Sequence, residues 1–116
     1  MGLSPVVTGS RAVTTTPTDI DSTGYFYHHV KIFFTHTFGI SDSYAIEYYE
    51  YDSVTGTWVM NDTDVVDYES IKDVNGVANK KKCWEINPTP GSGLRVRVYK
   101  LTGADGTLDY EVVKAA

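Results

Sequence analysis

Apolar and polar residues alternate one by one along most of the chain beyond residue 25, and this period of two is typical of half-buried β-strands. The alternation is clearest between Gly93 and Leu101. One face of that segment would carry Leu94, Val96 and Val98, and the other Arg95, Arg97 and Tyr99. In a second segment, Tyr44, Ile46 and Tyr48 would point inward and Ala45, Glu47, Tyr49 and Tyr51 outward.

Turn-forming residues separate segments of this kind at intervals of about 8–12 residues. The polar stretch Asn61–Asp64 is predicted to be a loop, and Asn75–Gly76 a hairpin turn. The predicted strands are Tyr25–Phe38, Tyr44–Tyr51, Thr57–Met60, Val77–Asn87, Gly93–Leu101 and Thr107–Val113. This spacing predicts an all-β protein, an antiparallel β-sandwich of Ig-like or jelly-roll-like type with about seven to eight short strands.

Residues 65–74 fit two structures. Asp64 would cap a short helix that stops at Gly76, and the apolar residues between them would also suit an irregular strand. We favour the strand because the neighbouring segments are strands.

The first 24 residues differ from the rest. They are rich in Thr and Ser, include Pro5 and Pro17, and show no sustained period. We predict two parts, an N-terminal arm over 1–24 that is extended or poorly ordered, and a sandwich domain over 25–116. Such an arm is either a loose terminus or a contact with a neighbouring subunit, in which Val6 and Val7 are candidate contact residues. Deleting it is expected to leave a folded domain.

The amino-acid composition limits the kinds of partner that the chain is expected to bind. The formal net charge is −5, and an acidic balance argues against nucleic-acid binding, which needs a basic surface. The acidic balance also argues against binding to an anionic membrane surface. No apolar run of the sequence is long enough to span a bilayer. The single cysteine, Cys83, allows no intrachain disulfide. We expect a chain without a signal peptide, because its first residues hold no apolar core of sufficient length.

The sequence offers no recognisable catalytic constellation. His28 and His29 are adjacent, so a strand would turn them to opposite faces, and His36 lies about 27 Å from His28 along an extended strand. Cys83 matches no nucleophile motif. We therefore predict a protein that is not an enzyme and needs no cofactor.

Four acidic residues form the best candidate for an ion site. Calcium takes several oxygen ligands from a flexible loop, and the residues here are Asp62, Asp64, Asp67 and Glu69. The spacing lacks the glycine and the terminal glutamate of the helical calcium loop. A solvated acidic turn is the simpler interpretation, and calcium stays open.

The outward side chains of two strands are the candidate contact residues: Tyr49, Tyr51, Tyr99, Arg95 and Arg97. Exposed aromatic residues on a sheet anchor protein interfaces or stack on sugars, unless a second layer of the same molecule covers them. Lys80–Lys82 could join the two arginines in a basic patch. We expect these cations to pair with Asp-rich loops of another subunit.

The order of landmarks resembles the small β-sandwich virion proteins of tailed bacteriophages that serve as decoration, head-fibre or accessory structural proteins. The landmarks are Thr37–Phe38–Gly39, an Asp-containing turn, Thr57–Trp58, the Asn75–Gly76 hairpin, Gly93–Val98, the Thr102–Gly103 turn and a final strand. They span about Val30 to Val113. This chain departs from that pattern in its extra tyrosines and its longer Asp-rich middle. The shared landmarks are structural, so no functional residue transfers.

The resemblance implies a non-enzymatic structural protein of a phage particle, assembled in the host cytoplasm. It would attach to capsid, neck or tail through contacts with other virion proteins and form a homo-oligomer. The alternative is a carbohydrate-binding β-sandwich that holds a surface glycan through Tyr49, Tyr51, Tyr99 and Trp58.

Overall fold

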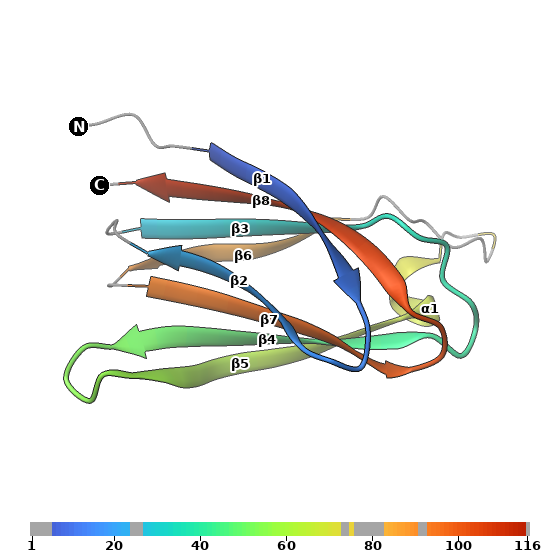
Figure 1. Ribbon diagram of the computed structural model, residues 1–116. Coiled ribbons are helices and arrows are strands. Elements are labelled where there is room, and N and C mark those ends of the chain that lie inside the picture. Colours follow the sequence, from blue (N-terminus) through green and yellow to red (C-terminus); the bar gives the residue numbers. More distant parts are fainter. Residues whose placement is uncertain (1–5, 24–26, 73–74, 76–82, 91–92, 116) are drawn as a thin grey trace.

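The computed structural model describes residues 6–23, 27–72, 75, 83–90 and 93–115, and for 27, 83–90, 114 and 115 it describes the backbone alone. The chain forms eight strands and one short helix (Figure 1). The elements are β1 (Val6–Val13), β2 (Thr18–Thr23), β3 (Tyr27–Phe34), β4 (Ser43–Asp52), β5 (Thr57–Asp67), α1 (Tyr68–Ile71), β6 (Cys83–Pro90), β7 (Gly93–Thr102) and β8 (Gly106–Ala115).

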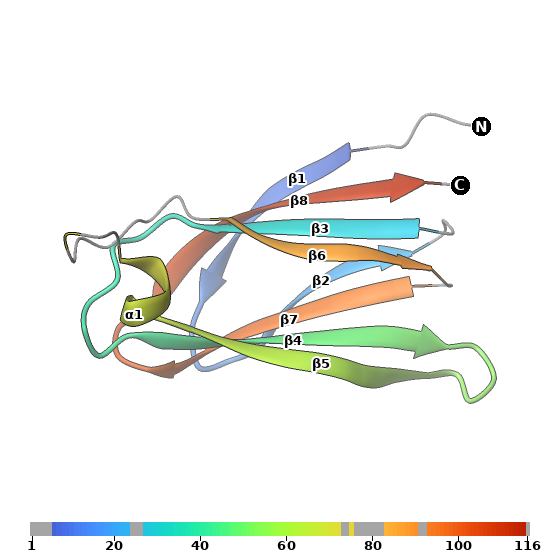
Figure 2. The ribbon, with the colours of Figure 1, turned by 180° about the vertical axis from the view of Figure 1, so that it is seen from behind.

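The strands build two antiparallel sheets that face each other, so the predicted β-sandwich is confirmed. The first sheet has the order β1-β8-β3-β6 and the second the order β2-β7-β4-β5. These orders are those of a jelly roll, in which successive strands alternate between the sheets except at the hairpin of β4 and β5. The structure thereby decides between the Ig-like and the jelly-roll-like arrangement. Figure 2 shows the two layers from behind, with α1 at one end between them.

The core lies between the sheets, where the inward residues of the alternating pattern meet. The predicted inner faces of β4 and β7 are confirmed. Tyr44, Ile46, Leu94, Val96 and Val98 are almost completely buried, and Tyr48 is partly buried against the core. The core cluster contains Val13, Ile20, Val30, Ile32, Phe34, Phe38, Tyr44, Ile46, Val66, Ile71, Leu94, Val96, Val98, Leu108 and Val112.

Residues 6–23 are not an arm outside the sandwich, which corrects the predicted boundary at residue 24. They are extended, but β1 pairs along its whole length with β8, and β2 pairs with β7. Val13 and Ile20 belong to the core. Residues 6–23 show no sustained alternation of apolar and polar residues, so the pattern did not predict these strands. Both strands lie at sheet edges, where polar side chains can reach water.

The predicted loop Asn61–Asp64 is wrong, because these residues continue the strand that begins at Thr57. A register shift opposite Tyr48 and Tyr49 marks a β-bulge at this place. β5 is an edge strand, so polar side chains on both of its faces can reach water.

The segment 65–74 contains both of the predicted structures, the end of a strand and a short helix. β5 ends at Asp67, and one helical turn follows in which Ile71 is buried. The helix starts three residues later than predicted because Asp67, not Asp64, caps it: Oδ1 of Asp67 accepts from the backbone N–H of Ser70 at 2.9 Å. The strand that we favoured is therefore wrong from Tyr68 onward. The expected hairpin at Asn75–Gly76 and the run Lys80–Lys82 lie outside the described residues.

The predicted strand Tyr25–Phe38 is shorter in the structure, where β3 ends at Phe34. Beyond it, a turn at residues 39–42 is closed by Asp42, whose Oδ2 accepts from the N–H of Gly39 at 2.7 Å. Phe38 lies outside the strand and still packs into the core, edge-on to Phe34 at 5.3 Å between ring centroids. The apolar pattern therefore continued past the end of the strand.

Candidate functional site

The outer face of the second sheet gathers most of the predicted contact residues. β7 turns its arginines and one tyrosine away from the core, as the alternation predicted, and β2 and β4 flank it on either side. We call this surface the docking face, and it consists of Asp19, Asp21, Glu47, Tyr49, Tyr51, Trp58, Arg95, Arg97 and Tyr99.

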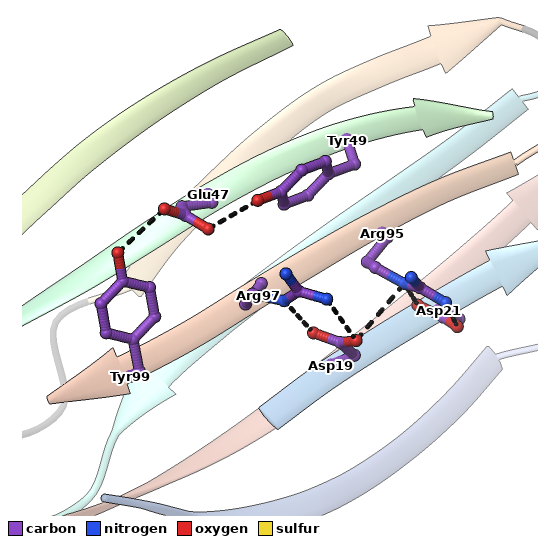
Figure 3. Close-up of polar contacts among 7 residues, drawn as sticks. All are labelled: Asp19, Asp21, Glu47, Tyr49, Arg95, Arg97 and Tyr99. Carbon is purple, nitrogen blue, oxygen red and sulfur yellow. Dashed lines mark hydrogen bonds and ion pairs between the residues drawn. The ribbon is translucent and has the colours of Figure 1, made fainter. Parts of the chain in front are cut away.

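Two arginine–aspartate pairs cross from β7 to β2. The antiparallel register places Asp19 opposite Arg97 and Asp21 opposite Arg95. Arg95 donates from Nε and Nη2 to the two carboxylate oxygens of Asp21 at 2.8 and 2.9 Å, and Arg97 donates in the same way to Asp19 at 2.8 and 3.1 Å (Figure 3). This two-pronged geometry holds each guanidinium in one orientation.

The pairs favour the charged forms of Asp19, Arg95 and Arg97. The hydrogen bond from Arg97 holds the pKa of Asp19 below its ordinary value of 3.8, with help from the charges of both arginines. In turn, the hydrogen bond with Asp19 raises the pKa of Arg97, and that with Asp21 raises the pKa of Arg95. Since the four side chains are partly exposed, each pair contributes only about 0.2–1 kcal/mol to stability. Their main effect is to fix the positions of the arginines.

A carboxylate joins two tyrosines on the same face. Tyr49 donates to Oε1 of Glu47 at 2.7 Å, and Tyr99 donates to Oε2 at 2.9 Å. Figure 3 shows the two phenol groups pointing at Glu47 from opposite sides. These hydrogen bonds raise the pKa of Tyr49 and of Tyr99, because ionised phenols would lose the bonds and repel the carboxylate.

The arginines also contact aromatic rings. The guanidinium carbon of Arg97 lies 5.2 Å from the ring centroid of Tyr49, and that of Arg95 lies 4.5 Å from Trp58. Trp58 meets Tyr51 edge-on at 5.3 Å. A Cβ at Gly93 would lie 3.0 Å from Cη2 of Trp58, so the glycine gives the indole room to lie close to the sheet.

The arrangement suits contact with another surface. Its charged and phenolic groups are bonded to one another, and its rings are held between them. Two shallow hollows, of about 360 and 390 Å³, lie instead on the outer face of the first sheet, on either side of the hydrogen bond from Ser10 to Asp109. The docking face is thus a sheet surface that presents aromatic rings and arginines held by hydrogen bonds.

The structure brings five of the seven predicted contact residues together, namely Tyr49, Tyr51, Tyr99, Arg95 and Arg97. Val6 and Val7 lie elsewhere, at the start of β1 in the other sheet, where both are exposed. The expected pairing of the arginines with another subunit is corrected, because their partners belong to the same chain.

Sequence reasoning missed the partners Asp19 and Asp21 and the linking role of Glu47. A signal was present. The alternating run Asp19–Ile20–Asp21 has the same period as Arg95–Val96–Arg97 and the opposite charge, which is what two paired strands with a common outer face would show. The signal was overlooked because residues 1–24 were assigned to an arm.

The other candidate residues have structural partners. Buried His28 bonds through Nδ1 to Oγ of Ser22 at 2.7 Å, and His36 bonds to Tyr44 and Thr107. The carboxylates of Asp62 and Asp64 bond to backbone N–H groups, and Asp67 caps α1. No group of three or more His, Cys, Asp or Glu residues in the described ranges could hold a metal ion. No helix in those ranges is long and apolar enough to cross a membrane.

Comparison with known proteins finds solved structures of similar fold. No family model matches the chain, and no curated protein sequence matches it. Among solved structures, a carbohydrate-binding module, CBM28, specific for non-crystalline cellulose, has a TM-score of 0.57 at 12% identity, covering 92% of this chain and 72% of that one.

Two further structures are similar. PirA has a TM-score of 0.54 at 14% identity, covering 91% of this chain and 92% of that chain. The Yersinia pseudotuberculosis-derived mitogen has a TM-score of 0.51 at 9% identity, covering 97% and 87%. At these identities the likeness is one of fold, and it agrees with the two-sheet architecture described above.

Proposed function

We propose that this chain is a non-enzymatic structural protein of a phage particle, which attaches to capsid, neck or tail by laying its docking face on another virion protein. The observation that carries the proposal is the preordered set of rings and arginines on that face. Aromatic residues and arginine dominate the energetics of protein interfaces. Because Asp19, Asp21 and Glu47 already hold these side chains in place, little conformational entropy is lost on binding.

Two further observations support a role in a particle. The jelly roll is an architecture of viral capsid and lectin domains, which is an argument by analogy of fold. The landmarks from Val30 to Val113 also resemble phage accessory proteins. A non-enzymatic role agrees with the way the ionisable side chains of the face are bonded to one another.

The experiment is co-sedimentation with phage particles. We expect the chain to travel with particles in a density gradient, and Tyr99→Ala or Trp58→Ala to release it. Phe33→Ala is the matched control, because this half-buried ring lies on the outer face of the opposite sheet. A chain that never travels with particles, or variants that stay bound as well as the control, would refute the proposal.

The start of β1 is a second candidate contact. Val6 and Val7 are 58% and 45% exposed on an edge strand, and edge strands join neighbouring subunits readily. In a homo-oligomer this edge would meet another copy. Light scattering of the purified chain and of Val6→Ser/Val7→Ser tests this idea: an oligomer that dissociates in the variant supports it, and a monomeric native chain opposes it.

A carbohydrate-binding module is the second candidate function. The specific observation is the pair of tyrosine rings around the carboxylate of Glu47, since ring faces stack on sugars and a carboxylate accepts sugar hydroxyls. CBM28, one of the similar structures, is specific for non-crystalline cellulose. Affinity electrophoresis in soluble glucans separates the two functions: retardation that Tyr49→Ala abolishes favours the glycan, and unchanged mobility favours protein docking.

A further inference from the structure

β5 is the outermost strand of the second sheet, and solvent reaches both of its faces. It pairs with β4 on one side, and within the described ranges no strand pairs with its other side. Every residue from Thr57 to Val65 is exposed except Trp58, which is partly exposed. Figures 1 and 2 both show β5 at the border of the molecule opposite β1. The strand is thus covered by its own sheet on one edge only.

Apolar side chains project from both faces of this strand. Val59 and Met60 are 49% and 48% exposed, and Val65 is 49% exposed. The register places Met60 and Val65 on the outer face, opposite Tyr49 and Ala45, and Val59 on the inner face. An edge strand with exposed apolar residues readily pairs with another chain unless something prevents it.

Two backbone N–H groups of β5 bond to aspartate side chains of the same strand. The N–H of Thr63 donates to Oδ1 of Asp62, and the N–H of Val65 donates to Oδ1 of Asp64, each at 2.8 Å. Thr63 and Val65 are two residues apart, so their N–H groups point to the same edge of the strand, and each is bonded to the carboxylate of the residue before it. An added strand that pairs through these N–H groups has to displace the two carboxylates.

The charge of an incoming strand decides whether it can displace the carboxylates of Asp62 and Asp64 from these N–H groups. A second copy of this chain paired along the same stretch would bring its own Asp62 and Asp64 against these two, and four carboxylates would repel one another. A strand with lysine or arginine at alternate positions would attract the carboxylates away from the N–H groups. Those donors would then bond to the carbonyl groups of the incoming strand.

We infer that the open edge of β5, from Thr57 to Val65, accepts an extended segment of a partner protein that carries basic residues at alternate positions. The segment adds a strand to the second sheet. Its cations pair with Asp62 and Asp64 on the inner face, and the apolar residues between them pack beside Met60 and Val65 on the outer face. Trp58 belongs both to this strand and to the docking face, but the strand pairing uses the backbone of β5 with Asp62 and Asp64, which are not part of the docking face, so the two proposals can fail independently.

A synthetic peptide tests the inference. The probe has nine residues in which lysine alternates with valine and threonine, and the readout is amide NMR of the intact chain. We expect the N–H signals of Thr63 and Val65 to shift and their hydrogen exchange to slow. The same peptide with N-methyl groups on its pairing edge should give neither effect, because it cannot complete a strand ladder.

Charge variants supply the matched control. Asp62→Asn/Asp64→Asn should weaken the peptide on the order of tenfold, as expected for two lost surface ion pairs. Asp109→Asn/Glu111→Gln removes the same charge from the outer face of the other sheet and should leave the affinity unchanged. Equal losses in both variants, or shifts spread over the acidic surface and absent at Thr63 and Val65, would overturn the inference. Tyr99→Ala, which disables the docking face, should bind the peptide normally.

Discussion

The hydroxyl of Tyr44 links the ring of His36 to the backbone of the β7–β8 turn. It lies 2.8 Å from Nε2 of His36 and donates to the carbonyl of Ala104 at 2.8 Å. Nδ1 of His36 lies 3.0 Å from the backbone nitrogen and 3.1 Å from the carbonyl oxygen of Thr107, so the ring also bonds to the start of β8. This chain of bonds fastens the end of β3 to the turn before β8.

Removing that hydroxyl should destabilise the sandwich. Tyr44→Phe leaves a half-buried ring nitrogen and a carbonyl without their partner, which costs about 0.5–1.5 kcal/mol. Urea denaturation measures the change in the free energy of unfolding. Tyr48→Phe is the control, because its ring is half-buried and its hydroxyl bonds to no described residue. Equal stability of the two variants would show that the link contributes nothing.

The turn that carries Ala104 depends on a glycine. Gly103 has φ of 85°, and a Cβ there would lie 2.1 Å from Oδ1 of Asp42. We expect Gly103→Ala to cost at least about 2 kcal/mol, from left-handed strain and the steric clash together. At Gly39 the added Cβ would lie 3.4 Å from the same side chain, so Gly39→Ala should change the free energy of unfolding little. A thermal melt of both variants checks the difference.

Acid should weaken the fold through two carboxyl groups. Burial raises the pKa of Asp42, but hydrogen bonds from the N–H groups of Ala104 and Gly39, with the nearby charges of His36 and Lys100, leave it below 3.8. The hydrogen bond from Arg97 lowers the pKa of Asp19. A depressed pKa in the folded state gives stability that is complete above the unfolded pKa.

That contribution is lost as the pH falls through the folded pKa. We therefore expect the free energy of unfolding to fall between about pH 5 and pH 2, and the fall to be shallower in Asp19→Asn or Asp42→Asn. Asp109→Asn is the control on the first sheet. Unfolding curves at a series of pH values give the slopes, and identical slopes in all variants would contradict the assignment.

Glu47 should control the titration of two tyrosines. Glu47→Gln removes the carboxylate whose hydrogen bonds and negative charge raise the pKa of Tyr49 and of Tyr99, so both should titrate closer to 10.0. Carbon NMR of labelled tyrosine rings resolves the two titrations. In the control Glu69→Gln, which changes a carboxylate on α1, both should titrate as in the native chain.

Deleting residues 1–24 distinguishes the observed role of this segment, as two strands of the sandwich, from its predicted role as an arm. Loss of residues 1–24 removes β1 and β2, exposes the edges of β8 and β7, and takes Val13 and Ile20 from the core. We expect the shortened chain to show no cooperative unfolding transition. A folded, monomeric product would mean that these strands are dispensable.

The alternating pattern predicted the fold class and the outward face of β7 and β4 because those strands lie within a sheet, with one side on the core and the other in water. In β7, the apolar Leu94 therefore marks the inner face and the charged Arg95 the outer face. The residues of the edge strands do not mark the two faces in this way. β1, β2 and β5 carry polar residues in positions that an inner strand would fill with apolar ones, so Asn61 suggested a loop and Thr18 an arm.

The partners of the arginines depend on strand order, which no local pattern encodes. Asp19 and Arg97 lie far apart in the sequence, and only the placement of β2 beside β7 brings them together. The linking role of Glu47 depends in the same way on the register that sets Tyr99 beside Ala45 on β4.

The jelly-roll order has a consequence for how this chain reaches its native state. Among the described strand pairs, only β4 and β5 follow each other directly, and the rest join distant segments, as Val6 joins Val113. Such a topology has a high contact order, which is typical of folding over milliseconds to seconds. On the ribosome the β4–β5 hairpin can form early, while β1 must wait until β8 is synthesised. Until β8 emerges, the edges of β1 and β3 stay open to aggregation.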